Sequence, residues 1–225
     1  MVEQPPVSSA PVRRVYVPVV SAETELASAF VDSVRGDAGT TIHILHCHVS
    51  VDAFDGAKIE REMPPPEIAR SDAFVLLAHF LDHGSIDTLQ RLYHRLRFIR
   101  SAPLGLFIFR NEGEHQFKIS CPECGQKLWV SEEEIGMRGR CVNCRQIIPI
   151  RSPAEMLRQR LSLPDSVPVL NVTRGNTAGC RGALANLVAR ALTGVVADRA
   201  ANPVRPVSEM TMPIQVAGDS APARR

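Results

Sequence analysis

The sequence predicts an α/β fold: a three-layer sandwich around a five-stranded, mainly parallel sheet, with one small cysteine-rich unit inserted into it. Short, almost wholly apolar segments alternate with segments of helical period along the 225 residues. That alternation is typical of a parallel sheet that helices cover on both faces. Two C-x-x-C motifs lie between the fourth and fifth apolar segments, and they predict a separate metal-binding unit.

The first half of the chain contains two predicted strands and one predicted helix. Residues 15–20 are β-branched and apolar, as a buried strand requires. Residues 23–34 carry apolar side chains at helical spacing and are expected to form a helix. Residues 41–51 are expected to form the second strand. We expect residues 52–72 to be mostly irregular, because three consecutive prolines rule out one continuous helix there.

The second half continues the alternation and frames the inserted unit. The host domain is expected to comprise residues 13–117 and 152–198, and the insertion residues 118–151. Because the insertion follows a strand, it leaves from the carboxyl edge of the sheet, where open α/β sheets bind ligands. The remaining expected strands are residues 73–80, 104–109 and 167–172, and the remaining expected helices are residues 85–99, 153–161 and 179–192.

The composition describes a globular chain without a strong charge. It is 44% hydrophobic, and 26 basic side chains against 24 acidic ones leave a net charge of +2. Such a balance provides no general attraction to nucleic acids or anionic membranes. The longest apolar run, residues 73–81, is far shorter than the roughly 20 residues of a membrane helix. Seven of the 17 prolines lie in residues 1–12 and 199–225, which are expected to be flexible tails.

The strongest motif is a set of four cysteines, Cys121, Cys124, Cys141 and Cys144. Two C-x-x-C turns with this separation predict a tetrahedral site for structural Zn²⁺, and disulfides, a redox pair and an iron site are the weaker alternatives. The segment resembles zinc ribbons of the rubredoxin-knuckle type. Four thiolate ligands leave no position open for a water molecule, so zinc catalysis is not expected. With no apolar signal at the N-terminus, the motif favours the reducing cytoplasm.

Basic residues surround these cysteines. Lys127, Arg138, Arg140 and Arg145 are either a nucleic-acid contact or local compensation for the negative charge of a zinc–thiolate centre. The second interpretation is favoured, since Glu132, Glu133 and Glu134 dilute the patch. Trp129 is expected to be a packing residue or a contact to a partner.

The host domain resembles the second half of a Ras-like or translation-factor-type GTPase domain. Residues 71–77 resemble the strand after the second switch, and residues 167–175 resemble the strand and loop that complete the guanine pocket. Residues 111–114 resemble the N-K-x-D motif, in which Asn111 alone matches.

The first half of the chain departs from that family. Residues 17–24 stand where the phosphate-binding loop belongs, but they contain no glycine and no lysine, and only Thr24 keeps its type. The resemblance therefore implies a degenerate, pseudo-GTPase-like scaffold that lacks the groups for hydrolysis.

A second and weaker resemblance is to TIR domains, through a first strand followed by residues 21–27. The TIR enzymes that cleave NAD carry a catalytic glutamate on a later helix. The matching segment, residues 85–99, contains no glutamate, and Asp87 is its only acid. The resemblance therefore implies a TIR-like interaction domain without that activity.

Several other residues carry weaker signals. His43, His46 and His48 flank Cys47; alternation puts His46 and His48 on one strand face, and a half-exposed polar face is favoured over a second metal site. Cys47 and Cys180 are expected to be small buried residues. The sequence assigns no role to Asn111.

Together these observations predict a non-catalytic, zinc-binding regulatory or protein-interaction protein in the cytoplasm, built on a pseudo-GTPase-like scaffold. The alternatives are a nucleic-acid-binding module that acts through the zinc ribbon and a TIR-like interaction domain. A protein partner is expected and nucleic acid remains open, whereas no membrane and no particular small-molecule ligand are indicated.

Overall fold

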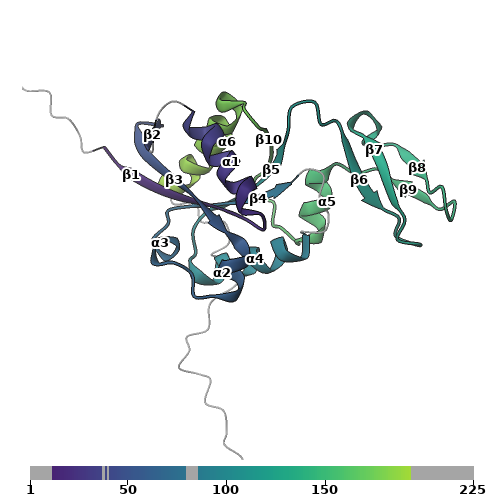
Figure 1. Cartoon of the computed structure of the whole chain (residues 1–225), viewed down its shortest axis with the longest axis horizontal. Helices are drawn as coiled ribbons and strands as arrows, with labels where there is room; N and C mark the ends of the chain where they lie inside the picture. Colours follow the sequence, from purple (N-terminus) through teal and green to yellow (C-terminus); the bar gives the residue numbers. More distant parts are fainter. Residues whose placement is uncertain (1–11, 37–38, 40, 80–85, 194–225) are drawn as a thin grey trace, which may run out of the picture.

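A computed structural model describes residues 12–36, 39, 41–79 and 86–193 of the chain. Its centre is a six-stranded sheet in the order β10-β5-β4-β1-β3-β2 (Figure 1). The general α/β class is therefore confirmed, but the sheet has six strands where five were expected. The strands are β1 (Arg14–Ser21), β2 (Thr41–Ile44), β3 (Cys47–Asp55), β4 (Phe74–His79), β5 (Leu104–Arg110) and β10 (Val169–Thr173).

The extra strand arises within residues 41–51, which were expected to form one strand. Leu45 and His46 have φ values of 49° and 60°, and they reverse the chain between β2 and β3. Two consecutive residues of positive φ form the tight turn whose twist suits a hairpin. Strand β2 consequently pairs antiparallel with β3, whereas the four other strand pairs of this sheet are parallel.

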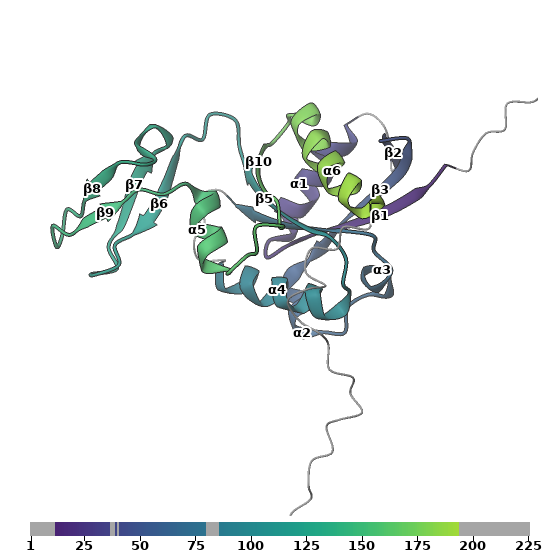
Figure 2. The same cartoon turned by 180° about the vertical axis from the view of Figure 1, so that it is seen from behind.

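The helices lie on the two faces of the sheet, and the two views of the cartoon agree on their placement (Figures 1 and 2). Helices α1 and α6 share one apolar cluster with β1, whereas α2, α3, α4 and α5 share the other. The helices are α1 (Thr24–Arg35), α2 (Gly56–Arg61), α3 (Pro66–Ala69), α4 (Ile86–Ile99), α5 (Pro153–Arg160) and α6 (Thr177–Leu192).

The expectation that residues 52–72 are mostly irregular was wrong. Strand β3 continues to Asp55, and α2 begins immediately after it. The Asp55 carboxylate accepts hydrogen bonds from the backbone N–H groups of Ala57 and Lys58, at 2.9 and 3.3 Å, and so caps the helix. The prolines do interrupt the helical path, and Pro66 opens α3.

Residues after β5 form a small unit that extends away from the sheet (Figure 1). It contains two antiparallel hairpins, β6 (Gln116–Ser120) with β7 (Lys127–Ser131), and β8 (Arg138–Arg140) with β9 (Ile147–Pro149). The short 3₁₀ helix η1 (Glu132–Glu134) connects them. We call residues 116–150 the ribbon.

Other expectations fall partly or wholly outside the described residues. The predicted tails, residues 1–12 and 199–225, are described only at Val12, and the predicted strand and helix ends at Phe80 and Ser85 are not described. None of the helices in the described ranges is both long and apolar enough to span a bilayer.

Candidate metal centre

Each hairpin of the ribbon holds one C-x-x-C motif in its turn. In the first turn, the Cys121 N–H donates to the Gln126 carbonyl and the Gly125 N–H donates to the Cys121 carbonyl, both at 2.9 Å. The second turn repeats this pattern. The Cys141 N–H donates to the Gln146 carbonyl and the Arg145 N–H to the Cys141 carbonyl, again both at 2.9 Å.

The repeated turns need one residue of positive φ each. Gly125 has a φ of 71° and Arg145 a φ of 62°. Glycine adopts this backbone without strain, whereas a side chain such as that of arginine makes it less favourable. The second turn therefore keeps its shape in spite of a local preference against it, which indicates that surrounding contacts impose the shape.

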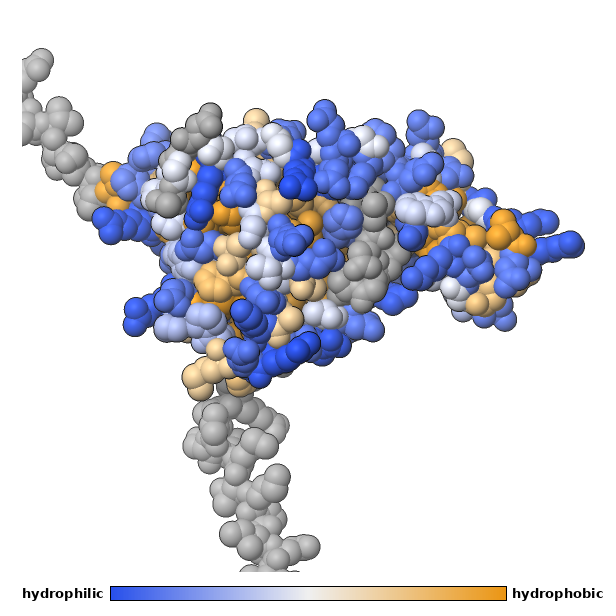
Figure 3. Space-filling model, in the orientation of Figure 1, coloured by the Kyte–Doolittle hydropathy of each residue, from blue (hydrophilic) through white to orange (hydrophobic). Residues whose placement is uncertain are grey.

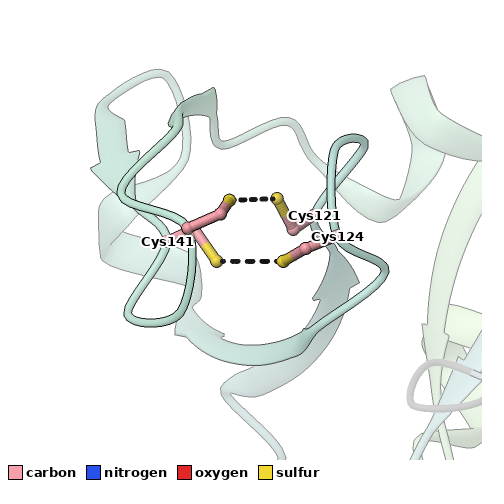
Figure 4. A group of neighbouring side chains, drawn as sticks. Cys121, Cys124 and Cys141 are labelled. Atoms are coloured by element: carbon pink, nitrogen blue, oxygen red, sulfur yellow. Dashed lines mark hydrogen bonds between the residues drawn. The ribbon is translucent and has the colours of Figure 1, made fainter.

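The four predicted ligands lie together although they come from two hairpins. The sulfur atoms of Cys121, Cys124, Cys141 and Cys144 are all within 4.8 Å of one another. Figure 4 shows the side chains of Cys121 and Cys124 directed across a gap toward the second turn, where a dashed line joins the Cys124 sulfur to that of Cys141. The Cys121 and Cys144 sulfurs are 3.5 Å apart, and the Cys124 and Cys141 sulfurs are 3.7 Å apart.

These separations fit a metal ion held by four thiolates. A tetrahedron with a metal–sulfur bond of about 2.3 Å has an edge of about 3.8 Å between sulfurs. A disulfide requires about 2.05 Å, and all six cysteines of the chain are free. The centre of the quartet thus has the size and the soft ligands that suit a thiolate-bound cation.

The pKa values of the exposed thiols also favour a bound cation. The Gln126 N–H group is the strongest of several hydrogen-bond donors that lower the pKa of the Cys124 thiol to about 6. For Cys144, the hydrogen bond from the Gln146 N–H group also lowers the thiol pKa. Desolvation and the neighbouring sulfurs raise the pKa by more, so this thiol stays protonated. A bound cation removes the conflict, because it stabilises all four thiolates together.

The quartet is half inside the ribbon and half at its surface. Cys121 and Cys141, the first cysteine of each turn, are 2% and 1% exposed. Cys124 and Cys144 are exposed. A short apolar core supports the buried pair, and it consists of Phe117, Ile119, Val130, Ile148 and Ile150.

An ion pair links the ribbon to the end of strand β5. Arg110 donates to the Glu132 carboxylate at 2.6 Å, and Glu132 also lies 3.3 Å from the His115 ring. Arg110 donates in addition to the Thr173 hydroxyl at the end of β10, at 3.4 Å. Glu132 therefore anchors the ribbon to the sheet rather than neutralising the ribbon's own cations.

In the described part of the chain, the basic residues of the ribbon form no ion pair with its acidic run. Arg138 and Arg140 lie on β8 and Lys127 on β7, all exposed, whereas Glu132–Glu134 form η1. Trp129 is 57% exposed, and the Lys118 ammonium lies 4.5 Å from its ring centre. Sequence reasoning missed the pairing of Lys118 with Trp129, which the β6–β7 register produces.

The half-exposed polar face that was favoured for the histidines is confirmed for His43 and His48, but the placement of His46 was wrong. His46 lies in the turn between β2 and β3, so it does not share a strand face with His48. His48 instead pairs with His43 across the hairpin, with ring centres 4.4 Å apart. In the described part of the chain, the cysteine quartet is the only group with metal-ligand spacing.

Two further predictions concern single residues. Cys47 and Cys180 are confirmed as buried, with 4% and 0% exposure.

Asn111 closes a turn after β5: its backbone N–H and its side-chain amide donate to the Glu114 carboxylate at 2.8 and 2.7 Å. Burial acts to raise the pKa of Glu114, and these two bonds outweigh it and lower the pKa.

The loop between β1 and α1 contains no phosphate cradle. The Glu23 N–H donates to the Ser21 hydroxyl at 3.2 Å, and α1 begins at Thr24 without a side-chain cap. The short loop offers the carboxylate of Glu23 where a phosphate-binding loop requires a cation.

The sequence was compared with models of protein families and with curated proteins, and neither comparison found a match.

Proposed function

We propose that this chain is a non-catalytic, zinc-binding interaction protein, in which the metal-stabilised ribbon presents the surface for a protein partner. One observation carries the proposal. Among the described residues, four of the eight exposed large apolar side chains lie on the ribbon, although it comprises only residues 116–150. They are Trp129 (57% exposed), Met137 (58%), Val142 (81%) and Ile147 (53%).

The exposed apolar side chains accompany polar ones on the same unit. Figure 3 shows hydrophobic residues gathered on the extended ribbon beside strongly hydrophilic residues. Exposed apolar clusters with polar surroundings are typical of protein interaction sites. A unit that extends from the body presents such side chains without obstruction from the sheet and its helices.

Zinc is the metal that the ligand set favours. The residues Cys121, Cys124, Cys141 and Cys144 would hold it, and their count leaves no open coordination position. When bound, the ion supplies the cross-link between the two hairpins, each of which is marginal alone. Two C-x-x-C motifs with the geometry of a metal site favour a reducing, cytoplasmic location.

For the body of the protein, we extend the proposal to a pseudo-GTPase-like scaffold. Two features support it: strand β1 leads directly into α1 through a short loop, and Asn111 follows strand β5. The missing lysine and glycines in the loop support the absence of hydrolysis.

A second candidate function, binding of single-stranded nucleic acid, is favoured by one face of the β6–β7 hairpin. Lys118 lies opposite Trp129 and Lys127 lies opposite Ser120. The remaining pair on this face, Gln116 and Ser131, is uncharged. An exposed aromatic ring beside cations, with no acid on the face, suits a stacked base and its phosphates.

The test of the main proposal compares matched apolar surfaces. In one variant Val142 and Ile147 on the ribbon are replaced by serine, and in the control Met63 and Phe98 on the body are replaced by serine. Met63 and Phe98 are 91% and 87% exposed, so the control removes at least as much exposed apolar area. Quantitative affinity purification should lose its specific partners with the ribbon variant alone, while the zinc content stays at one ion per chain.

Unchanged partners for the ribbon variant would refute the proposal. The nucleic-acid candidate is tested separately by fluorescence anisotropy with a labelled single-stranded oligonucleotide. With Lys118 and Lys127 as the contacts, the logarithm of affinity should fall with that of salt concentration with a slope of about −1.4. Replacing Trp129 by alanine should also weaken that binding, whereas the absence of saturable binding at low salt would eliminate this candidate.

A further inference from the structure

A pocket lies at the carboxyl edge of the central sheet, apart from the cysteine quartet. It is bounded by the ends of β4, β5 and β10 and by the first turns of α1. In open parallel sheets, ligands bind outside the carboxyl ends of the strands. The ribbon leaves the body from this same edge, after β5.

The two walls of this carboxyl-edge pocket carry opposite charges. Arg110 and Arg174 extend the ends of β5 and β10 and line one wall. Glu23 and Glu25, at the start of α1, line the other wall. The apolar side chain of Phe109, which is 2% exposed, also contributes to the lining.

Three of these charged side chains have no partner among the described residues, and all three are exposed. In the described part of the chain, the side chains of Arg174, Glu23 and Glu25 form neither an ion pair nor a hydrogen bond. Arg110 is engaged differently, since Glu132 and Thr173 hold its guanidinium in place at the mouth of the pocket.

The volume limits what this space accepts. The pocket encloses about 200 Å³, which corresponds to about seven water molecules at about 30 Å³ each. Sites for drug-sized ligands and cofactors occupy roughly 300–1,000 Å³. The carboxyl-edge pocket therefore suits a molecule of a few heavy atoms rather than a nucleotide.

The charge pattern selects among small molecules. An anion that contacts Arg174 also faces the carboxylates of Glu23 and Glu25, and a cation that contacts those carboxylates also faces the two arginines. A ligand that carries both charges matches both walls, whereas an anion or a cation alone lies beside one wall of like charge.

We propose that the carboxyl-edge pocket binds a small zwitterion of the α-amino-acid class. The ligand's carboxylate contacts Arg174 and Arg110, and its ammonium contacts Glu25 and Glu23. The Asn111 side chain also lines this pocket. The proposal is independent of the ribbon's role as an interaction surface.

The experiment screens the full-length, zinc-loaded chain against the twenty standard L-amino acids by saturation-transfer NMR, with calorimetry for those that bind. Each binding amino acid is then compared with its analogue without the ammonium group and its analogue without the carboxylate. The variants are Arg174→Gln and Glu25→Gln, and Glu112→Gln is the control, because Glu112 is exposed and does not line the pocket.

At least one amino acid should bind, and both single-charge analogues should bind at least about tenfold more weakly. Arg174→Gln and Glu25→Gln should each weaken binding by about tenfold as well, since both remove a charged hydrogen-bond partner, whereas Glu112→Gln should leave it unchanged. Thermal melting of each variant checks that the fold is intact. The proposal is overturned if no amino acid binds, if an analogue with one charge binds as well as the zwitterion, or if the control weakens binding as strongly as the pocket variants.

Discussion

Replacing one cysteine of the quartet should release the metal and unfold the ribbon while the α/β body stays folded. The four sulfurs are equivalent in kind and lie within 4.8 Å of one another, so each is expected to carry a similar share of the metal affinity. Structural zinc contributes roughly 10–16 kcal/mol in small domains. One ligand of four then accounts for about 3 kcal/mol, which is more than about 100-fold in affinity.

The change to make is Cys141→Ser, because Cys141 is 1% exposed and belongs to the buried pair. The matched control is Cys47→Ala, which removes a buried cysteine of β3 that is not part of the quartet. Metal analysis should find one zinc ion per chain in the unmodified protein and in the control. The Cys141→Ser protein should retain well below one ion after dialysis against a weak chelator.

The chain contains its own reporter of the ribbon. Trp129 is the single tryptophan of the sequence and lies on β7, with Lys118 next to its ring. Its fluorescence therefore reports on the ribbon alone, whereas far-ultraviolet circular dichroism is dominated by the helices of the body. A strong chelator should change the Trp129 emission and leave most of the dichroism intact. A chelated protein with native Trp129 emission, or a Cys141→Ser protein that keeps its full zinc, would refute the reasoning.

Three further predictions concern the fold around the two sites. Gly56→Ala should lower the free energy of unfolding by about 1–3 kcal/mol in denaturant titrations, since an added Cβ would lie 2.5 Å from both the Leu92 side chain and the Ser21 carbonyl oxygen. The matched change Gly182→Ala in α6, where nothing lies within 4 Å of the added atom, should be neutral or stabilising by up to about 1 kcal/mol. Gly125→Ala should destabilise the ribbon by about 1–2 kcal/mol, measured through Trp129, because φ at this position is +71°. Burial raises the pKa of the Cys180 thiol to about 11, so the unfolded chain loses this proton first as pH rises from about 8.5, and stability should decline by about 3 kcal/mol toward pH 11.

Each of these predictions has an outcome that contradicts it. Equal stability of the Gly56→Ala and Gly182→Ala proteins would show that the contact of Gly56 with β1 is not tight. If the Gly125→Ala ribbon is as stable as the unmodified ribbon, the first turn tolerates a side chain as readily as the second turn tolerates that of Arg145. For Cys180, the decline at high pH must become smaller in a Cys180→Ala protein, and an identical decline would assign it to other groups.

Local patterns were sufficient to predict several parts of this structure. The C-x-x-C turns place their own sulfurs, because the backbone bonds of each turn run between residues only four or five apart. The apolar runs that became β1, β4 and β5 were recognisable for a similar reason, since a strand buried on both faces tolerates almost no polar side chain. The burial of Cys47 and Cys180 followed from the same apolar surroundings.

Other parts were wrong because their signal is weak or conflicting. The β2–β3 turn uses Leu45 and His46, neither of which is a typical residue for a turn of positive φ. The alternating pattern of residues 41–51 therefore resembled one strand, and His46 was placed on the wrong surface. Helix α2 was missed because the run of prolines nearby masked the capping signal of Asp55.

By itself, the sequence determined which four cysteines form the candidate metal centre and where the α/β alternation runs, since both depend on residues that are close along the chain. Only the tertiary structure decided which charges meet. Among the described residues it pairs Glu132 with Arg110 of the body and leaves the ribbon's lysines and arginines without an ion pair to Glu132–Glu134. It also brings Arg174 and Glu25, about 150 positions apart, to opposite walls of one pocket. The physical reason is that a formal charge is a property of a residue, whereas its energetic role depends on the neighbours that long-range packing supplies.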